Sequence, residues 1–391
     1  MFFPVALAVS FCQAASLIGA DALGLEQPPQ NAVIVRNGLA PQNPAINAFE
    51  NKTKFGTSIR FEHANASNGD NSLGLNSFTV PSISMVLPLG FLGTFGIGLE
   101  QKYFANNRFE LVDTELDANV LYASRTGLYE LAPSYSLRLP LFLSDFAIGT
   151  SYRIFFGNSY SILERGKSQK WDDNNSWMVN GIQITDKKTG EFKKIDDDWW
   201  QSFGWSLHYH KKTADYFVSY FPAVEMEKTT RTNVQFSNSD TLKSKKTTEN
   251  FKLPEHFASG VNFLFLKKHN VSLVYECQKW VENELVETQV ANSYFVEYKL
   301  NGTGLHYSQF FQRNNFGINA WYAEKYIKGV TEFGASLLSD LWLGRRGTLV
   351  GLQLFGGYRD AEAENYWNEM FFGFKLNLTG VGNWGTSSRR R

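Results

Sequence analysis

Apolar and polar side chains alternate along most of this chain, and this period of two limits the fold more than any other feature of the sequence. Residues 55–62, 203–210, 294–300 and 372–378 each place an apolar or β-branched side chain at every second position, mostly with polar residues or glycine between. Such alternation is typical of a β-strand whose two faces meet different surroundings. The sequence therefore predicts an all-β fold.

The same pattern recurs over segments long enough to cross a membrane. Strands of soluble proteins cluster near about five or six residues, whereas a tilted strand that crosses a bilayer needs about 9 to 11. We expect about 12 to 16 strands, and no run of about 18 apolar residues suggests a transmembrane helix after the first residues. The further expected strands cover residues 79–89, 91–104, 118–126, 129–141, 144–157, 214–226, 257–267, 270–281, 303–313, 315–326, 330–342 and 346–359.

Connections and aromatic residues favour a barrel over a secreted β-sandwich, which would also alternate. Outer-membrane barrels join their strands by tight turns at one rim and by long loops at the other. Short turns are expected at 267–270, 301–302 and 313–315, and long extracellular loops at 164–198, 227–252 and 282–291. Aromatic pairs that suit a membrane interface stand at expected strand ends, namely Trp199-Trp200, Trp321-Tyr322 and Tyr366-Trp367.

The charge balance and the cysteine count exclude two other classes of protein. Lys and Arg total 38, as do Asp and Glu, so the formal net charge is zero. A nucleic-acid binder needs an excess of basic residues to displace counterions from phosphates, so we expect no nucleic-acid partner. The two cysteines, Cys12 and Cys277, provide no disulfide framework.

The first residues resemble a secretory signal peptide. Met1–Phe11 is an apolar run of the length of a signal-peptide core, and small residues follow it. Cleavage after Ala14 or after Ala22 fits this pattern, and we assign residues 1–22 to the signal peptide. A lipoprotein attached through Cys12 is a weaker alternative, because the preceding residues lack a small side chain.

An unusual segment, residues 23–54, separates the signal peptide from the first clear strand. It contains Asn43-Pro44-Ala45, and the alternating strand Phe55–Phe61 follows. This order resembles the start of the FadL family of outer-membrane long-chain fatty-acid transporters. The resemblance implies that Asn43, Pro44 and Ala45 belong to a hatch that plugs the barrel. The chain departs from the family at Asn31–Arg36, where family hatches are rich in glycine and alanine, and an ordinary turn at Pro44 is the alternative.

Several expected strands carry apolar residues on both faces, which a barrel with a polar lumen does not need. Examples are 217–221, 261–266 and 370–372. Inward apolar residues would line a dry tunnel or pack against a plug. A carrier of amphipathic molecules also needs polar groups for the head group, and the candidates at alternating positions beside apolar neighbours are Arg60, Arg138, Arg153 and Lys299.

Enzyme and metal chemistry find little support in the sequence. No Gly-x-Ser-x-Gly elbow and no phosphate-binding glycine-rich loop is present. His208 and His210 lie two residues apart, so they face the same side of a strand at a spacing that can bind a metal. No third ligand is identifiable from the sequence. We therefore predict no catalytic residues, no metal and no cofactor.

Together these features predict a transmembrane antiparallel β-barrel of about 14 strands over residues 55–379, with an N-terminal plug over 23–54 and a polar tail over 380–391. The expected function is passive, plug-gated uptake of a hydrophobic or amphipathic small molecule through the bacterial outer membrane, with outer-membrane lipid around the barrel. The alternatives are a non-transporting barrel whose long loops bind an extracellular protein as a scaffold or secretion partner, and a soluble secreted β-rich binding protein.

Overall fold

A computed structural model of the chain describes fifteen separate stretches of it. These are residues 16, 18, 23–28, 42–68, 72–113, 118–139, 145–166, 184–195, 199–236, 243–266, 268–280, 287–302, 314–343, 348–362 and 367–382. Most of the expected signal peptide, the expected strand at 303–313, Tyr366 and most of the tail lie outside these residues. No helix within the described ranges is both long and apolar enough to cross a membrane.

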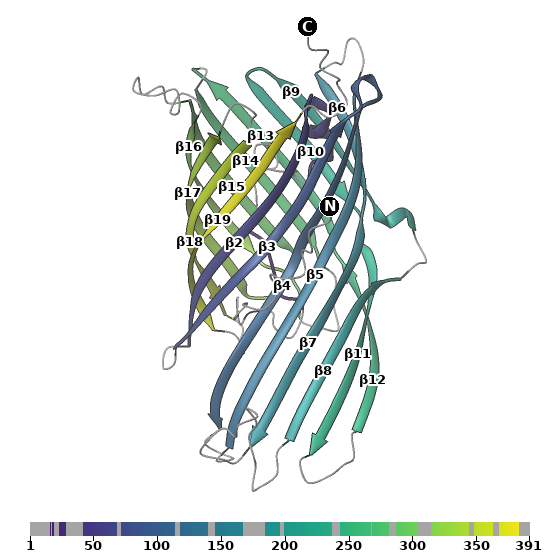
Figure 1. The fold of residues 1–391 in the computed structure, drawn as a ribbon, viewed down its shortest axis with the longest axis vertical. Helices are drawn as coiled ribbons and strands as arrows, with labels where there is room; N and C mark the ends of the chain where they lie inside the picture. The colour runs from purple at the N-terminus through teal and green to yellow at the C-terminus, as the bar shows by residue number, and fades with distance from the viewer. Residues whose placement is uncertain are drawn as a thin grey trace.

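The described residues form one antiparallel sheet that closes on itself, because the last strand pairs with the first long one (Figure 1). Three short 3-10 helices accompany it, η2 (Pro44–Phe49), η3 (Gly90–Leu92) and η5 (Trp199–Ser202). The strands are β1 (Leu25–Glu26), β2 (Thr53–Ser67), β3 (Ser72–Pro88), β4 (Thr94–Asp113), β5 (Ala118–Arg138), β6 (Phe146–Tyr152), β7 (Ile154–Gly166), β8 (Ile184–Lys194), β9 (Phe203–Lys211), β10 (Ala214–Phe221), β11 (Val224–Phe236), β12 (Lys243–Leu253), β13 (Glu255–Phe265), β14 (His269–Lys279), β15 (Ala291–Asn301), β16 (Asn315–Glu324), β17 (Val330–Leu343), β18 (Thr348–Ala361) and β19 (Asn368–Gly382).

Four of the barrel's crossings are each made by two consecutive strands with a break between them. These are β6 with β7, β8 with β9, β10 with β11, and β12 with β13. Pro222 and Pro254 stand at two of the breaks, and proline lacks the N–H that a ladder needs. Counted in this way, β2 to β19 make fourteen crossings over the described residues, so the expected barrel of about 14 strands is confirmed.

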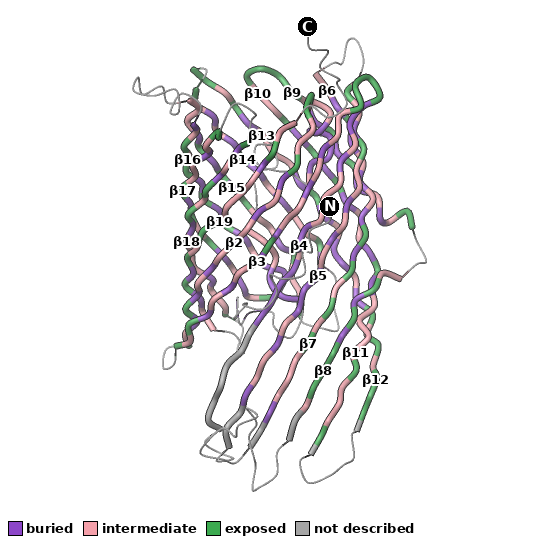
Figure 2. The backbone as a smooth tube through the Cα atoms, viewed as in Figure 1, coloured by how far each residue is buried: buried purple, intermediate pink, exposed green. Residues whose placement is uncertain are grey.

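Residue burial alternates along the strands as the sequence predicts (Figure 2). On β9, Trp205 and Leu207 are exposed, whereas Ser206 and His208 between them are buried. Many of the buried side chains of the barrel wall are polar or charged, and many of the exposed ones are large and apolar. An apolar outer face with a polar interior is the pattern of a barrel surrounded by lipid.

The sheet continues beyond the barrel on one side, where β7, β8, β11 and β12 project together with the far halves of β4 and β5 (Figure 1). The expected loops at 164–198 and 227–252 are wrong in this respect, because they contain β8 and most of β11 and β12. These strands are rich in Lys, Glu and Thr on both faces. A strand whose two faces both meet water has no reason to alternate in polarity, so the sequence pattern did not mark them.

Three smaller expectations also change. Residues 118–126 and 129–141 were expected as two strands but form the single strand β5, and the strand expected at 144–157 is broken at Arg153. Trp321 does not stand in an outer aromatic girdle. It is 6% exposed and its Nε1 donates to Glu332 Oε1 inside the barrel at 2.9 Å. Neighbouring residues of a strand point to opposite faces, so only Tyr322 of that pair faces outward.

Candidate functional site

The segment around Asn43-Pro44-Ala45 lies against the inner face of the barrel wall. Pro44 begins η2, a position where its fixed φ fits and no N–H is required. The Ala45 N–H donates to Ser206 Oγ of β9 at 2.7 Å, and Asn43 and Ala45 are fully buried. Asn43, Pro44 and Ala45 are thus brought together on the barrel's inner surface.

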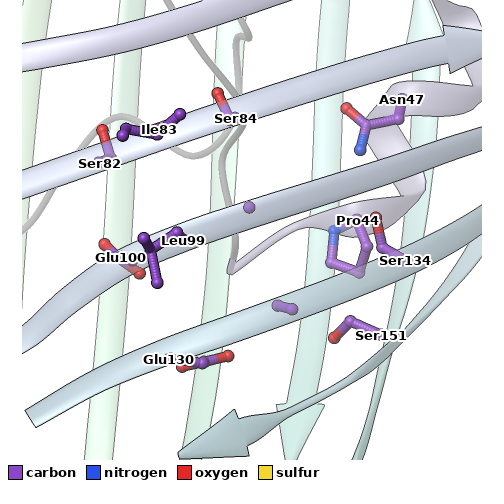
Figure 3. Close-up of a pocket in the computed structure, with 12 residues that line it drawn as sticks. Pro44, Asn47, Ser82, Ile83, Ser84, Leu99, Glu100, Glu130, Ser134 and Ser151 are labelled. Carbon is purple, nitrogen blue, oxygen red and sulfur yellow. The ribbon is translucent and has the colours of Figure 1, made fainter. Parts of the chain in front are cut away.

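The wall fits η2 closely because small residues face it. A Cβ added at Gly149 of β6 would lie 2.4 Å from the Ala45 nitrogen and 2.7 Å from the Pro44 carbonyl carbon. Figure 3 shows Pro44 and Asn47 beside the β5 and β6 strands that carry Ser134 and Ser151. The backbone of η2 therefore occupies the place that a side chain at residue 149 would need.

A second N-terminal element, β1, attaches to the wall where β3 and β4 separate. The pairing of β3 with β4 extends only from Pro88↔Thr94 to Ser82↔Glu100. Beyond it, β4 has a bulge at Lys102 and then pairs with β1 through Phe104 and Tyr103. A bulge bends its strand and increases the local twist, which accounts for the divergence of β4 from β3. β1 thus pairs with the part of β4 that β3 no longer pairs with.

Gly24 makes this attachment sterically feasible. Its φ is +90°, and a Cβ there would lie 2.2 Å from the backbone carbon of Phe104. Only glycine adopts such a backbone at no cost while approaching another strand so closely. Tyr326 fixes the same turn from the opposite side of the lumen, because its hydroxyl donates to the Gly24 carbonyl at 2.9 Å.

One cluster of inward apolar side chains packs on N-terminal residues, although it includes none of the three segments named from the sequence. Ile18, Leu23 and Leu25 belong to one buried cluster with residues from across the barrel, and each is at most 6% exposed. Ser16 Oγ contacts both carboxylate oxygens of Glu369 at 2.8 Å. The barrel members of this cluster are Tyr103, Leu128, Phe155, Phe192, Val224, Met226, Phe251, Leu253, Trp280, Ala291, Tyr326, Ile327 and Val330. Of the two expected uses of inward apolar residues, packing against an inner segment is the one seen at this cluster.

Two of the expected head-group arginines are already paired with protein carboxylates. Arg153, at the break between β6 and β7, is 7% exposed, and its Nε donates to Glu130 Oε1 at 3.0 Å. Arg60 Nη2 donates to Glu62, and its Nη1 donates to Gln27 Oε1 of the N-terminal segment at 3.0 Å. Arg60 therefore links the wall to that segment.

The remaining basic candidates differ in exposure. Arg138 is exposed at the end of β5, with its guanidinium carbon 5.3 Å from the centre of the Phe49 ring. Lys299 is buried and paired with Asp340. Of the four basic residues proposed for the head group, Arg138 is therefore exposed and the other three are buried.

Charged residues that the sequence analysis did not single out form the interior network. Arg359 contacts Glu62 at 2.7 Å, Glu332 at 2.9 Å and Glu369 at 3.0 Å, and all four are buried. Lys325 lies 3.4 Å from Glu332. Buried charges require partners. Glu332 and Glu369 come from the strands on either side of Arg359, and Glu62 comes from β2, 297 residues away. The sequence marks these residues in one way only: each is a charged residue at a position that the alternation directs into the barrel.

Glu26 of β1 is the ionisable side chain that the N-terminal segment places among these groups. The residue as a whole is half-buried, but both of its carboxylate oxygens are buried, and this burial raises the pKa of the carboxyl above the usual value, against the opposing charge of Lys325. Glu26 lines a small cavity together with Gln27, Lys102 and Arg153. A buried carboxyl with a raised pKa makes the seating of β1 sensitive to protonation.

The cavities beside the N-terminal segment are small. The one next to η2 measures ≈ 30 Å³ and the one next to β1 measures ≈ 60 Å³. An apolar cavity that holds a benzene molecule needs about 150 Å³. A larger hollow of ≈ 440 Å³ lies on the projecting sheet and is lined mainly by Ser, Thr, Tyr and charged residues. With the N-terminal segment in this position, neither of the two small cavities has room for a single aromatic ring.

Among the described residues, one group of side chains could hold a metal ion, namely His208, His210 and Asp215. The two histidines are recognisable from their spacing in the sequence, whereas Asp215 is not. The third residue is brought in by the pairing of β10 with β9.

Comparisons with known proteins find the same barrel fold in solved structures of low sequence identity. The sequence matches no family model and no curated protein. Among solved structures, a Pseudomonas aeruginosa FadL homologue matches with a TM-score of 0.60 at 9% identity, over 92% of this chain and 99% of that one. The Pseudomonas putida toluene transporter TodX matches with 0.58 at 10% over 92% and 99%, and the Ralstonia pickettii toluene transporter TbuX with 0.53 at 9% over 92% and 98%. The fold implied by the resemblance to the FadL family, a transmembrane β-barrel, is confirmed.

Proposed function

We propose that this chain is a bacterial outer-membrane channel for passive uptake of hydrophobic or amphipathic small molecules, gated by its N-terminal residues 23–54, and that it has no enzymatic activity. The observation that carries the proposal is the position of η2 and β1. Together they contact β4, β5, β6 and β9, and they cover part of the edge at which β3 and β4 part. The barrel fold it shares with a FadL homologue and with toluene transporters supports the substrate class.

The orientation follows from the two rims. Tight connections, such as β9 to β10, lie at the rim where β19 ends, and the long strands project from the other (Figure 1). Outer-membrane barrels place short turns in the periplasm and long extensions outside. In this orientation a ligand meets the projecting sheet first, with its Ser- and Thr-lined hollow, and then the N-terminal segment.

The substrate is the finer part of the proposal. The paired state of Arg60 and Arg153 means that a ligand carboxylate has to displace a protein carboxylate to reach either guanidinium. An uncharged hydrocarbon needs no such exchange. We propose long-chain fatty acids as one substrate class, and toluene as the comparison compound that separates the two chemistries.

Uptake by whole cells tests this function. Cells that produce the barrel should accumulate labelled oleate or toluene faster than cells without it, and deletion of residues 43–50 should change the rate while the unboiled protein still migrates as a compact band. Removal of the projecting parts of β8, β11 and β12 serves as the contrasting variant. If oleate and toluene both enter at the rate of barrel-free cells, the transport proposal fails, and loss of protein binding on trimming would favour the scaffold alternative.

Processing of the N-terminus has its own test. Ser16 and Ile18 make buried contacts inside the barrel, which favours cleavage after Ala14 over cleavage after Ala22. The mass of the mature protein distinguishes the two, since retention of residues 15–22 adds eight residues.

A further inference from the structure

We propose that His208, His210 and Asp215 form a binding site for a divalent transition-metal ion, with Zn²⁺ as the ion that fits their chemistry. Metal binding at this site is coupled to the position of Asn43. Two imidazole nitrogens and one carboxylate oxygen are a ligand set typical of zinc. The existence of the site is independent of the proposed transport. Its link to gating rests on the proposed function.

The hairpin of β9 and β10 brings the three side chains to one face. His208 and His210 are two residues apart on β9, so both point inward. Asp215 lies directly opposite His210 in the antiparallel register, and directly opposed residues share a face. Only Lys212 and Thr213 join the two strands. The ligand set is therefore built on a short, rigid hairpin.

The distances are close to those of a bound metal. The Nδ1 or Nε2 atoms of the histidines and a carboxylate oxygen of Asp215 all lie within 4.8 Å of one another. His208 Nε2 is 3.5 Å from Asp215 Oδ1, and His210 Nδ1 contacts the same oxygen. Ligands of a tetrahedral zinc ion lie about 3.3 Å apart, given bond lengths of about 2.0–2.1 Å. Small side-chain movements therefore complete the geometry.

His208 supplies the second observation that points to a ligand. Its side chain is fully buried, and its Nε2, although 3.5 Å from Asp215 Oδ1, makes no hydrogen bond of normal geometry within the described residues. A buried polar atom without a partner costs free energy, and coordination would remove this cost. The neighbouring His210 side chain is 49% exposed, which leaves a path for the ion and a coordination position for water.

The surroundings supply further polar contacts of the kind found around metal sites. Asn262 Nδ2 donates to Asp215 Oδ2 at 3.3 Å and orients the carboxylate. Asn43 Nδ2 lies 3.0 Å from His208 Nδ1, and the Phe49 ring covers both imidazoles at 5.5 and 4.9 Å between ring centres. Groups that hold a ligand's second ring nitrogen fix its tautomer and orientation.

Asn43 couples the metal to the N-terminal segment. As its amide nitrogen donates to Nδ1, the neutral ring of His208 carries its proton on Nε2. Coordination at Nε2 requires the proton on Nδ1 instead, which then donates to Asn43 Oδ1 after the amide turns by half a rotation. Metal binding and the seating of Asn43 are thus linked, and each must change the free energy of the other.

Cobalt binding provides the direct test, with barrel purified in detergent without a histidine tag and stripped with EDTA. One equivalent of Co²⁺ should give visible absorption typical of histidine coordination, and Zn²⁺ should abolish it. His208→Ala and Asp215→Asn should each weaken Zn²⁺ binding by more than the 10- to 100-fold that loss of an outer-shell partner costs. Asn43→Ala should fall within that 10- to 100-fold range. His269→Ala is the matched control, as His269 lies on β14 and contacts Tyr298.

The outcomes separate the site from its link to gating. Absence of the cobalt band, or equal Zn²⁺ affinity of wild type and Asp215→Asn with both migrating as compact unboiled bands, overturns the site. If the site binds Zn²⁺ but Asn43→Ala leaves the affinity unchanged, the coupling to the N-terminal segment is overturned. Failure of oleate and toluene uptake with intact Zn²⁺ binding would count against the proposed function alone.

Discussion

Substitution of Gly149 by alanine should displace η2 from the barrel wall although the sequence of η2 is unchanged. The new Cβ would lie 2.4 Å from the Ala45 nitrogen, 2.6 Å from its Cα and 2.7 Å from the Pro44 carbonyl carbon, whereas ordinary contacts begin at 3.4 Å. All three are backbone atoms, so rotation of a side chain cannot relieve the overlap. The segment has to move by about 1 Å, the difference between 3.4 and 2.4 Å.

The free-energy change of seating follows from two contributions. Overpacking of a fitted contact costs about 1–3 kcal/mol. A movement of about 1 Å also breaks the 2.7 Å hydrogen bond from the Ala45 N–H to Ser206 Oγ, which contributes about 0.5–1.5 kcal/mol. The sum of about 1.5–4.5 kcal/mol raises the ratio of unseated to seated barrel roughly tenfold to a thousandfold, at about 1.4 kcal/mol per factor of ten.

Thiol labelling and single-channel recording measure this change. Ala45 is fully buried, so a cysteine introduced there, in a Cys277→Ser background, should react slowly with an aqueous maleimide. Gly149→Ala should accelerate the reaction by the factor given above and raise the open fraction in planar bilayers. The matched control is Gly98→Ala, because Gly98 lines the same cavity as Pro44 and a Cβ there meets nothing within 4 Å. Equal labelling rates in the two variants would refute the reasoning.

Three further predictions concern the charged wall and β1. Arg153→Gln leaves the buried Glu130 without its main partner and should cost about 3 kcal/mol, seen as a lower temperature of loss of the compact band, while Arg138→Gln, at an exposed site, should leave that temperature unchanged. Gly24→Ala should detach β1, because its φ is +90° and a Cβ would overlap β4, and protease should then cut the N-terminal segment faster; an unchanged cutting rate contradicts the assignment. Burial raises the pKa of Glu26, so the seated state binds the proton more tightly, and seating of β1 should strengthen as pH falls through that raised pKa and weaken as pH rises through it. Conductance recorded from about pH 5 to about pH 8 should show this dependence in wild type and lose it in Glu26→Gln.

The alternation of side chains predicted most of the strands, because lipid outside and polar groups inside impose one period along every crossing, and strand length and connections then favoured a barrel. It failed where that physical contrast ends. β8, β11 and β12 carry polar residues on both faces, so nothing in their pattern distinguished them from loops. Trp321 and Tyr322 are adjacent aromatic residues in the sequence, yet the pleat sends one into the barrel and the other out.

The candidate site was only partly accessible from the sequence. The Asn43-Pro44-Ala45 segment was found by its position before the first strand, but its seat on Gly149 and Ser206 depends on residues more than 100 positions away. The spacing of residues in the sequence could not link Asp215 to His208 and His210, since only the register of the hairpin places the three side chains on one face of the sheet.

The sequence by itself determined long strands with one apolar and one polar face, since period-two alternation is a local property that any strand carries along its own length. The tertiary structure alone decided what fills the barrel and which charges meet. Arg359 gathers Glu62, Glu332 and Glu369 from three other strands, and β1 joins β4 only where β3 departs from it. Glu332 and Glu369 lie opposite Arg359 through the registers of β17–β18 and β18–β19, whereas Glu62 reaches it only because β19 closes the sheet against β2. No local pattern relates these residues.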